Sequence, residues 1–134
     1  MRTVLLVENE PIARNYLKQA LGPHCIALEA SSAVEALDFC RGHREIDVLV
    51  CDVELGLISG MELASLMRAW LPKLHTILTS DLSCDQWTPR QETELRELPP
   101  DDVLILERPF TPAELHAALT RLVCGSVEPL VGAF

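Results

Sequence analysis

Two apolar runs in this chain end in carboxylates, and these side chains are the first candidates for chemistry. The first run, VLLVENE, ends with Glu8 and Glu10, and the second, DVLVCD, ends with Asp52. Unbroken runs of Val and Leu are typical of strands buried on both faces, which form parallel sheets whose crevice lies beyond the strands' carboxyl ends. We therefore expect Glu8, Glu10 and Asp52 to share one pocket. Carboxylates gathered in this way favour either a divalent metal ion with oxygen ligands or an acid–base pair.

Periodicity along the chain predicts the elements that hold these carboxylates. Apolar runs predict strands near residues 3–7, 25–29, 48–52, 76–79 and 103–106. Helical patterns with capping residues or prolines at their ends lie between them, at about 11–22, 32–42, 59–71 and from 111 onward. With right-handed crossovers, this alternation predicts an α/β fold, a doubly wound five-stranded parallel sheet with flanking helices.

Two of these helices carry apolar stripes that we expect to face the sheet. The stripe of the first helix consists of Ile12, Tyr16, Leu17, Ala20 and Leu21, and that of the third consists of Leu63, Leu66, Met67 and Trp70. The stretch 81–102 is polar and rich in proline, with room for about two helical turns at 91–98. Within it, Cys84 and Trp87 form either ordinary loop packing or a patch that contacts a partner.

Composition limits the partners and the compartment. At 134 residues the chain has the length of one domain, expected at 1–123, with a loose tail at 124–134. The net charge of −9 disfavours nucleic acid and anionic lipid surfaces. No apolar stretch reaches the ~20 residues of a membrane span and no signal-peptide pattern opens the chain, so a cytoplasmic location is expected. The five cysteines contain no CxxC pair and are expected to be reduced thiols.

Five motifs, taken in order, resemble those of a known family. They are VLLVENEP at the first strand, ASSAVEAL after the second, DVLVCD with Gly60 eight residues after Asp52, TILTS at the fourth strand, and RPF at residues 108–110. From about residue 3 to residue 123 the chain resembles the receiver domain of two-component response regulators, whose fold is flavodoxin-like. Each motif is weak alone, so the order and spacing of all five give the signal.

The resemblance implies a phosphorylation site. Asp52 matches the residue that accepts a phosphoryl group from a histidine kinase or phosphotransfer protein of a phosphorelay. Thr79 matches the hydroxyl that hydrogen-bonds this phosphoryl group, and Arg108 stands where the family has a lysine. A cis peptide bond before Pro109 is implied as well. The expected protein is no enzyme beyond gaining and losing a phosphoryl group at Asp52.

The output of such a phosphoprotein is contact with other proteins. The resemblance implies a downstream protein target that binds the face made by the last two helices and the last strand. A homodimer is left open, because nothing in the chain fixes the oligomeric state. No partner of the nucleic-acid or membrane class is expected from the charge.

The resemblance also implies a magnesium ion beside the phosphoacceptor. Its ligands would be Asp52, Asn9, the backbone carbonyl of Glu54, and waters held in part by Glu8. Asn9 departs from the family, because a carboxylate is usual there. At 4 Å and an effective dielectric of 20, a lost charge is worth about 4 kcal/mol against a unit charge. We therefore expect Mg²⁺ to bind more weakly than in a typical receiver.

Two alternative functions share features with this pocket. With Asn9 and Arg108, the pocket also matches a pseudo-receiver, a protein interaction module that works without phosphorylation. Ile105 favours the same alternative. Many receivers have at this position an aromatic residue that rotates inward on activation, and isoleucine has no ring to rotate. A phosphatase of the dehalogenase type also uses an aspartate nucleophile and magnesium. That class needs a DxD pair on its first strand, whereas Asp52 lies on the third.

Overall fold

A computed structural model of the chain describes residues 2–42 and 45–124. Five parallel strands form one sheet in the order β2-β1-β3-β4-β5. The strands are β1 (Arg2–Val7), β2 (Cys25–Ala30), β3 (Val48–Asp52), β4 (His75–Ser80) and β5 (Val103–Glu107). Each predicted strand lies inside the observed one, with at most one further residue at either end. The predicted doubly wound, flavodoxin-like α/β fold is confirmed.

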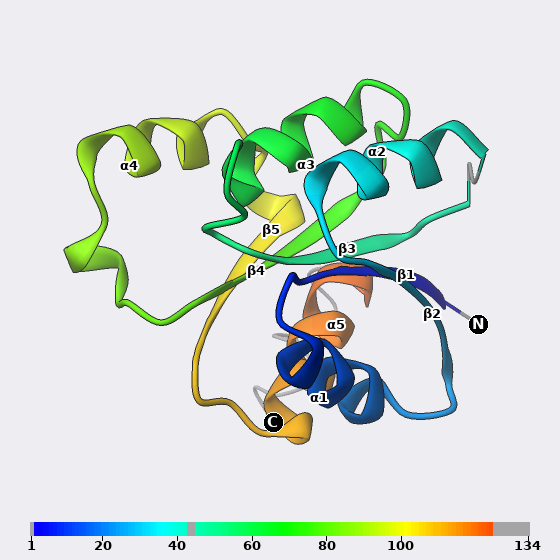
Figure 1. Ribbon diagram of the computed structural model, residues 1–134. Coiled ribbons are helices and arrows are strands. Elements are labelled where there is room, and N and C mark those ends of the chain that lie inside the picture. Colours follow the sequence, from blue (N-terminus) through cyan, green and yellow to red (C-terminus); the bar gives the residue numbers. More distant parts are fainter. Residues whose placement is uncertain (1, 43–44, 125–134) are drawn as a thin grey trace.

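Helices cover both faces of the sheet (Figure 1). The helices α1 (Pro11–Leu21) and α5 (Pro112–Cys124) lie on one face, and α2 (Ala33–Gly42), α3 (Gly60–Arg68) and α4 (Pro89–Arg96) lie on the other. Ser32 caps α2 by accepting a hydrogen bond from the backbone N–H of Glu35 at 3.1 Å. The carboxylate of Glu35 accepts from the backbone N–H of Ser31 at 2.7 Å, one residue before the expected position. Sequence capping signals therefore placed this helix well.

The unbroken apolar pattern of the strands is explained by two cores, one on each face. In β1, Leu5 and Val7 belong to the cluster under α2 and α3, whereas Val4 and Leu6 belong to the cluster under α1 and α5. All four side chains are fully buried. Successive residues of a strand point to opposite faces, so a strand covered on both sides needs apolar residues at every position.

The predicted stripe of α3 is wrong at two of its four positions. Leu63 and Met67 are buried, but Leu66 is 49% exposed and Trp70, which lies beyond the helix end, is 43% exposed. The buried face instead includes two small residues, Gly60 and Ala64, which a search for large apolar side chains passes over. Small residues let the helix backbone approach the sheet closely and so fix which face is buried.

The stripe of α1 is likewise narrower than predicted. Leu17 and its neighbours at 20 and 21 are buried, whereas Ile12 is 86% exposed and Tyr16 is 43% exposed. Both exposed residues lie in the first six positions of the helix and line a groove described below. An apolar pattern cannot distinguish a core contact from an open apolar surface.

Residues 81–102 form more structure than the sequence predicts. They contain η1 (Cys84–Gln86), α4 and η2 (Pro100–Asp102). Helix α4 begins two residues before the expected turns because Thr88 and Gln91 form a capping box. Trp87 is 7% exposed and joins the core, which supports loop packing, whereas Cys84 is exposed.

Three predictions about the chain as a whole concern membrane spans, the C-terminal tail and the cysteines. In residues 2–42 and 45–124, no helix is long and apolar enough to cross a membrane. The predicted tail at 124–134 lies outside the described residues, except that Cys124 ends α5. The four cysteines whose side chains are described, at positions 25, 40, 51 and 84, are free thiols, as expected.

Candidate functional site

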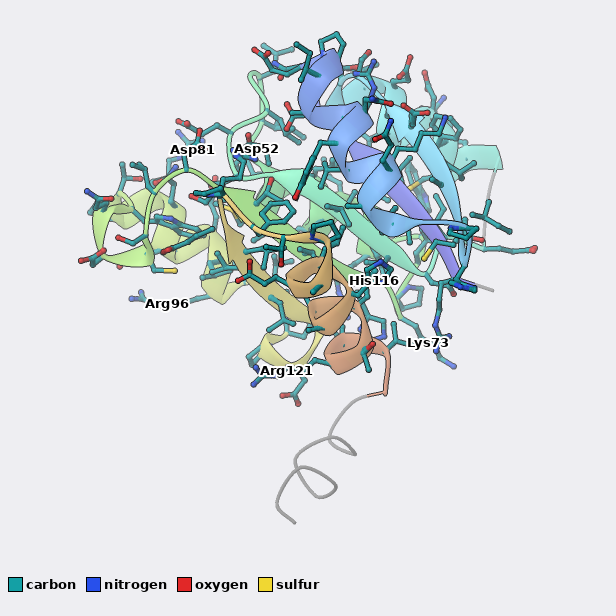
Figure 2. All side chains as sticks on the ribbon, turned by 90° about the horizontal axis from the view of Figure 1, so that it is seen from below. Asp52, Lys73, Asp81, Arg96, His116 and Arg121 are labelled. Atoms are coloured by element: carbon teal, nitrogen blue, oxygen red, sulfur yellow. The ribbon has the colours of Figure 1, made fainter. Side chains whose placement is uncertain are left out.

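The carboxyl ends of the strands bring the predicted residues to one edge of the sheet. Asp52 is the last residue of β3 and pairs in register with Thr79 of β4, while Glu8 directly follows β1. Arg108 directly follows β5, and its backbone N–H donates to the carbonyl of Ser80 at 2.8 Å. Figure 2 shows Asp52 and Asp81 close together at this edge. Parallel pairing alone therefore gathers side chains that lie up to 100 residues apart in the chain.

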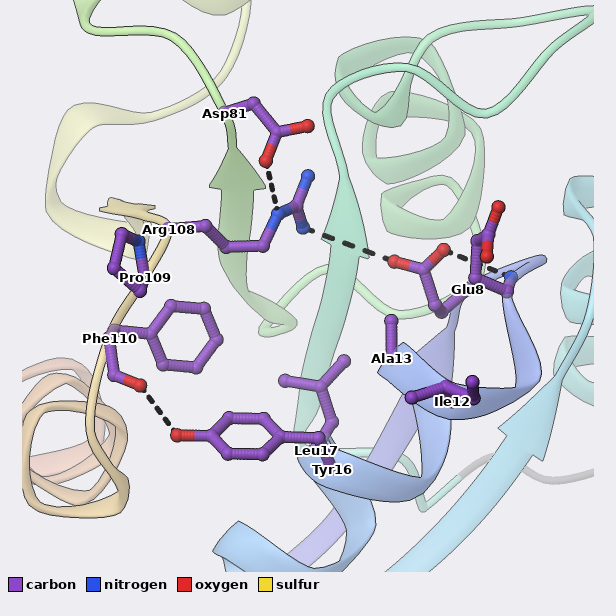
Figure 3. A pocket seen from close by; sticks show the side chains of 10 residues that line it. Glu8, Ile12, Ala13, Tyr16, Leu17, Asp81, Arg108, Pro109 and Phe110 are labelled. Atoms are coloured by element: carbon purple, nitrogen blue, oxygen red, sulfur yellow. Dashed lines mark hydrogen bonds and ion pairs between the residues drawn. The ribbon is translucent and has the colours of Figure 1, made fainter.

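Arg108 connects the acidic and hydroxyl groups of this edge. Its Nη2 donates to Asp52 Oδ2 at 2.8 Å, and its Nη1 donates to Thr79 Oγ1 at 2.9 Å. Its Nε donates to Asp81 Oδ1 at 2.7 Å, and Nη1 also lies 4.0 Å from Glu8 Oε1. Figure 3 shows the guanidinium between Glu8 and Asp81. The Arg108–Pro109 peptide bond is cis, as the resemblance implies.

Glu8 is the buried acid of the site. Its residue is 3% exposed, and its Oε2 accepts the backbone N–H of Glu10 at 3.1 Å. Burial raises the pKa of Glu8, and the charge of Asp52 raises it further, while the Glu10 hydrogen bond and the positive charge of Arg108 act in the opposite direction. Burial alone would lower the pKa of Arg108, but hydrogen bonds and charges from Asp81 and Asp52 outweigh it and raise this pKa.

Asp52 is held by the backbone around it. Its Oδ1 accepts the N–H of Glu54 at 3.0 Å, and the N–H of Gly60 donates to the carbonyl of Val53 at 2.9 Å. Gly60 opens α3 directly against the strand end, where a Cβ atom would lie 2.3 Å from the Asp52 carbonyl oxygen. This close approach fixes the loop after Asp52, and only glycine leaves room for it.

The expectation of one pocket for the three predicted acids is only partly met. Glu8 and Asp52 both reach Arg108, whereas Glu10 is exposed and lines, with Glu8 and Arg108, a groove whose lining does not include Asp52. Glu10 is also the N-cap residue of α1, so its backbone already turns away from the strand edge toward the helix. Asn9 between them is exposed.

We call the sheet edge that carries Glu8, Asp52 and Asp81 the acidic edge. A large groove lies next to it, between α1 and the segment that follows β5 (Figure 3). It has a volume of about 740 Å³. Its wall is apolar, formed by Ile12, Ala13, Tyr16, Leu17, Pro109 and Phe110, and its rim is charged, formed by Glu8, Glu10, Asp81 and Arg108. The Tyr16 hydroxyl donates to the Phe110 carbonyl at 2.5 Å and so links α1 to the segment that follows β5 across the groove.

A second, small hollow lies directly on Asp52. Its volume is about 20 Å³, which is room for one water-sized group, and Asp81 and Trp87 contribute to its lining. Within the described part of the chain, the buried indole N–H of Trp87 has no hydrogen-bond partner. The sequence interpretation did not include Asp81 in the site, although a carboxylate two residues after Thr79 was a usable signal.

The side chains fit a divalent metal ion only weakly. Glu8 and Asp52 offer carboxylate oxygens, the ligands that Mg²⁺ prefers, but Arg108 lies near both. Over residues 2–42 and 45–124, no group of three His, Cys, Asp or Glu residues could hold a metal ion. The exposed Asn9 amide adds an oxygen without a charge. The possible metal ligands are therefore two carboxylates and one neutral oxygen, and Arg108 is a positive charge that competes with the metal.

Comparisons with solved structures agree with the fold of the chain. Three similar chains are a receiver domain from Methanospirillum hungatei JF-1 (16% identity, 90% of this chain and 92% of that chain covered, TM-score 0.77), chemotaxis protein CheY4 of Vibrio cholerae (21%, 92% and 99%, 0.78) and a response regulator receiver protein from Sinorhizobium medicae WSM419 (25%, 92% and 95%, 0.77). None of the curated proteins compared with the chain matches it.

The family comparison covers most of the chain. A family model for the response regulator receiver domain matches residues 4–120, a span that contains all five strands from Val4 onward and each residue of the acidic edge. With the strand order, the aspartate that ends β3 and the cis Arg108–Pro109 bond, this match identifies the chain as a member of the response regulator receiver domain family.

Proposed function

We propose that this chain is a single-domain receiver that accepts a phosphoryl group on Asp52 from a histidine kinase or phosphotransfer protein in the cytoplasm, and signals through protein contacts. One observation carries the proposal. The carboxylate of Asp52, the hydroxyl of Thr79 and the guanidinium of Arg108 form one hydrogen-bonded group at the carboxyl edge of the sheet. A nucleophile, a hydroxyl donor and a cation are the parts that phosphoryl transfer needs.

The residues around Asp52 support transfer of a phosphoryl group to its carboxylate. An Asp52 oxygen forms a bond to phosphorus while the P–N bond of the donor phosphohistidine breaks, and the imidazole keeps the electron pair of that bond. Arg108 is already within hydrogen-bond distance of Asp52 and Thr79, so its charge can stabilise the transferred oxygens without long movement. A magnesium ion held by Glu8 and Asp52 would add further charge neutralisation.

The apolar groove supports docking of the phosphoryl donor. Ile12 is 86% exposed at the start of α1, beside the charged rim that contains Glu8 and Arg108. An exposed apolar wall next to an acidic rim suits a partner surface with apolar and basic side chains. A donor that docks there would present its phosphohistidine to the edge where Asp52 lies.

A second candidate function, the phosphorylation-independent interaction module, also has a specific observation in its favour. Arg108 already satisfies Asp52, Thr79 and Asp81 without any phosphoryl group. In addition, Ile105 packs against the core and has no hydroxyl-bearing ring that could change position when Thr79 moves. A pocket whose charges are balanced in this way can serve as a fixed structure for protein binding.

Phosphorylation by a small donor separates the two functions. The chain is incubated with acetyl phosphate and Mg²⁺, and intact mass reports phosphoryl adducts. We expect one adduct in the wild type and in Glu54→Gln, a matched control that removes an exposed carboxylate two residues away. We expect none in Asp52→Asn. A wild type without adduct under every metal condition would support the interaction module.

A further inference from the structure

We propose that Arg108, held in place by Asp81, is the resident cation of this pocket and competes with a divalent metal ion for Asp52. The geometry points to this role because the guanidinium lies 2.8 Å from Asp52 Oδ2 and 4.0 Å from Glu8 Oε1. These are the two carboxylates that a metal ion would also use. The inference concerns the same site as the proposed function, but its test needs no phosphoryl donor.

Arginine has the shape for this role, and lysine does not. The guanidinium uses three nitrogens at once: Nη2 on Asp52, Nη1 on Thr79 and Nε on Asp81. A lysine ammonium has one nitrogen at the end of a flexible stem and cannot bond Asp81 from the side while it reaches Asp52 and Thr79. Asp81 and the arginine at position 108 therefore act as a matched pair.

Partial burial and an existing contact with Asp52 give the guanidinium an advantage over a metal ion. Its side chain is 25% exposed and that of Asp52 is 19% exposed, so their contact is partly shielded from solvent. The other oxygen of Asp52 accepts the N–H of Glu54. A divalent ion that bound Glu8 and Asp52 would lie beside a positive charge already within hydrogen-bond distance of Asp52. Metal binding therefore requires Arg108 to withdraw, and Asp81 opposes that withdrawal.

Substitution of Asp81 tests the competition because two explanations predict opposite signs. Asp81 is a carboxylate near the pocket, so if it only supplied negative charge, Asp81→Asn would weaken binding of a cation. If it holds Arg108 in the metal position, the same change frees the guanidinium and strengthens binding. Asp81 is 78% exposed, so we expect a gain of about two- to fivefold in Mn²⁺ affinity.

The measurement is a titration of Mn²⁺ into the metal-free protein, followed by calorimetry and by paramagnetic broadening of amide signals near Asp52. The matched control is Asp85→Asn, which removes the same charge from the same loop but from a residue whose described hydrogen-bond partner is Ser83. We expect Asp85→Asn to leave the affinity unchanged or slightly lower. Equal effects of the two substitutions, or a weaker site in Asp81→Asn, would overturn the proposal.

A second variant keeps the charge and changes only the geometry. Arg108→Lys retains one positive charge but cannot contact Asp52 and Asp81 together, so we expect Mn²⁺ to bind roughly tenfold more tightly, the factor of one charge-assisted hydrogen bond. Affinity equal to that of the wild type would mean that net charge alone sets metal binding. Absence of Mn²⁺ binding in all variants would also overturn the competition. Each result stands whether or not Asp52 accepts a phosphoryl group.

Discussion

Gly60→Ala tests whether the close contact between α3 and the end of β3 holds the site together. The added Cβ would lie 2.3 Å from the carbonyl oxygen of Asp52 and 3.0 Å from Cys51 Sγ. The first contact is with backbone, which cannot rotate away, so either the start of α3 or the end of β3 must move. Gly60 is needed here for space and not for an unusual backbone angle, because its φ is not positive.

The expected size of the effect follows from this contact. Inserting a methyl group into a packed site costs about 1–3 kcal/mol. Replacing glycine by alanine in a helix returns up to roughly 1 kcal/mol. We therefore expect a net loss of about 1–2 kcal/mol in the free energy of unfolding, which corresponds to a lower Tm by roughly 3–10 °C. Because the strained atom belongs to Asp52, phosphorylation by acetyl phosphate should slow as well.

Denaturant and thermal unfolding of two variants provide the assay. Gly42→Ala is the control, because Gly42 lies at the end of α2, has a φ outside the positive range, and has no described atom within 4 Å of its added Cβ. We expect Gly42→Ala to be neutral or stabilising by a few tenths of a kcal/mol. If Gly60→Ala were as stable as its control and reacted at the wild-type rate, the contact would not constrain the site.

Three further outcomes are expected from single residues. Because burial raises the pKa of Glu8, its contribution to stability is complete below the unfolded pKa and is lost as pH rises through the folded pKa; Glu8→Gln should therefore raise Tm at neutral pH and lose this advantage below about pH 4, as thermal melts at several pH values would show. Tyr16→Phe removes the hydrogen bond to the Phe110 carbonyl and should cost about 0.5–1.5 kcal/mol in urea unfolding. The exposed Cys84 should react with iodoacetamide in the native protein, and mass spectrometry should find Cys51, whose thiol pKa burial raises, alkylated only after unfolding.

The sheet and the core of the site could be predicted from the sequence for one physical reason. Strands buried on both faces leave unbroken apolar runs, and parallel strands bring their carboxyl ends to one edge. The position of Asp52 beside Thr79 and Arg108 follows directly from the positions of β3, β4 and β5. The resemblance to receivers used the same residues, so both arguments depend on the strand ends.

The sequence did not predict contacts that arise only when side chains meet across the fold. Asp81 is a polar loop residue until Arg108 reaches it with Nε, a contact across 27 positions of the chain. Helix faces were misjudged where small residues carry the packing, as at Gly60 and Ala64. Glu10 was predicted to join the pocket because it follows an apolar run, but the start of α1 turns it toward solvent.

The loop after Asp52 also connects the pocket directly to the helix layer that contains α3 and α4. Ser59 caps α3 by accepting the N–H of Glu62 at 3.1 Å, and its hydroxyl donates to Glu94 of α4 at 2.9 Å.

Helix α4 has no fully buried residue of its own; its Leu95 is partly buried against the core, and the buried Trp87 and Leu98 lie at its flanks. Ile105, packed against the core, lacks the hydroxyl-bearing ring that would respond to Thr79. We therefore expect a change at Asp52 to reach α4 through the loop at 53–59 and the Ser59–Glu94 hydrogen bond, rather than through β5.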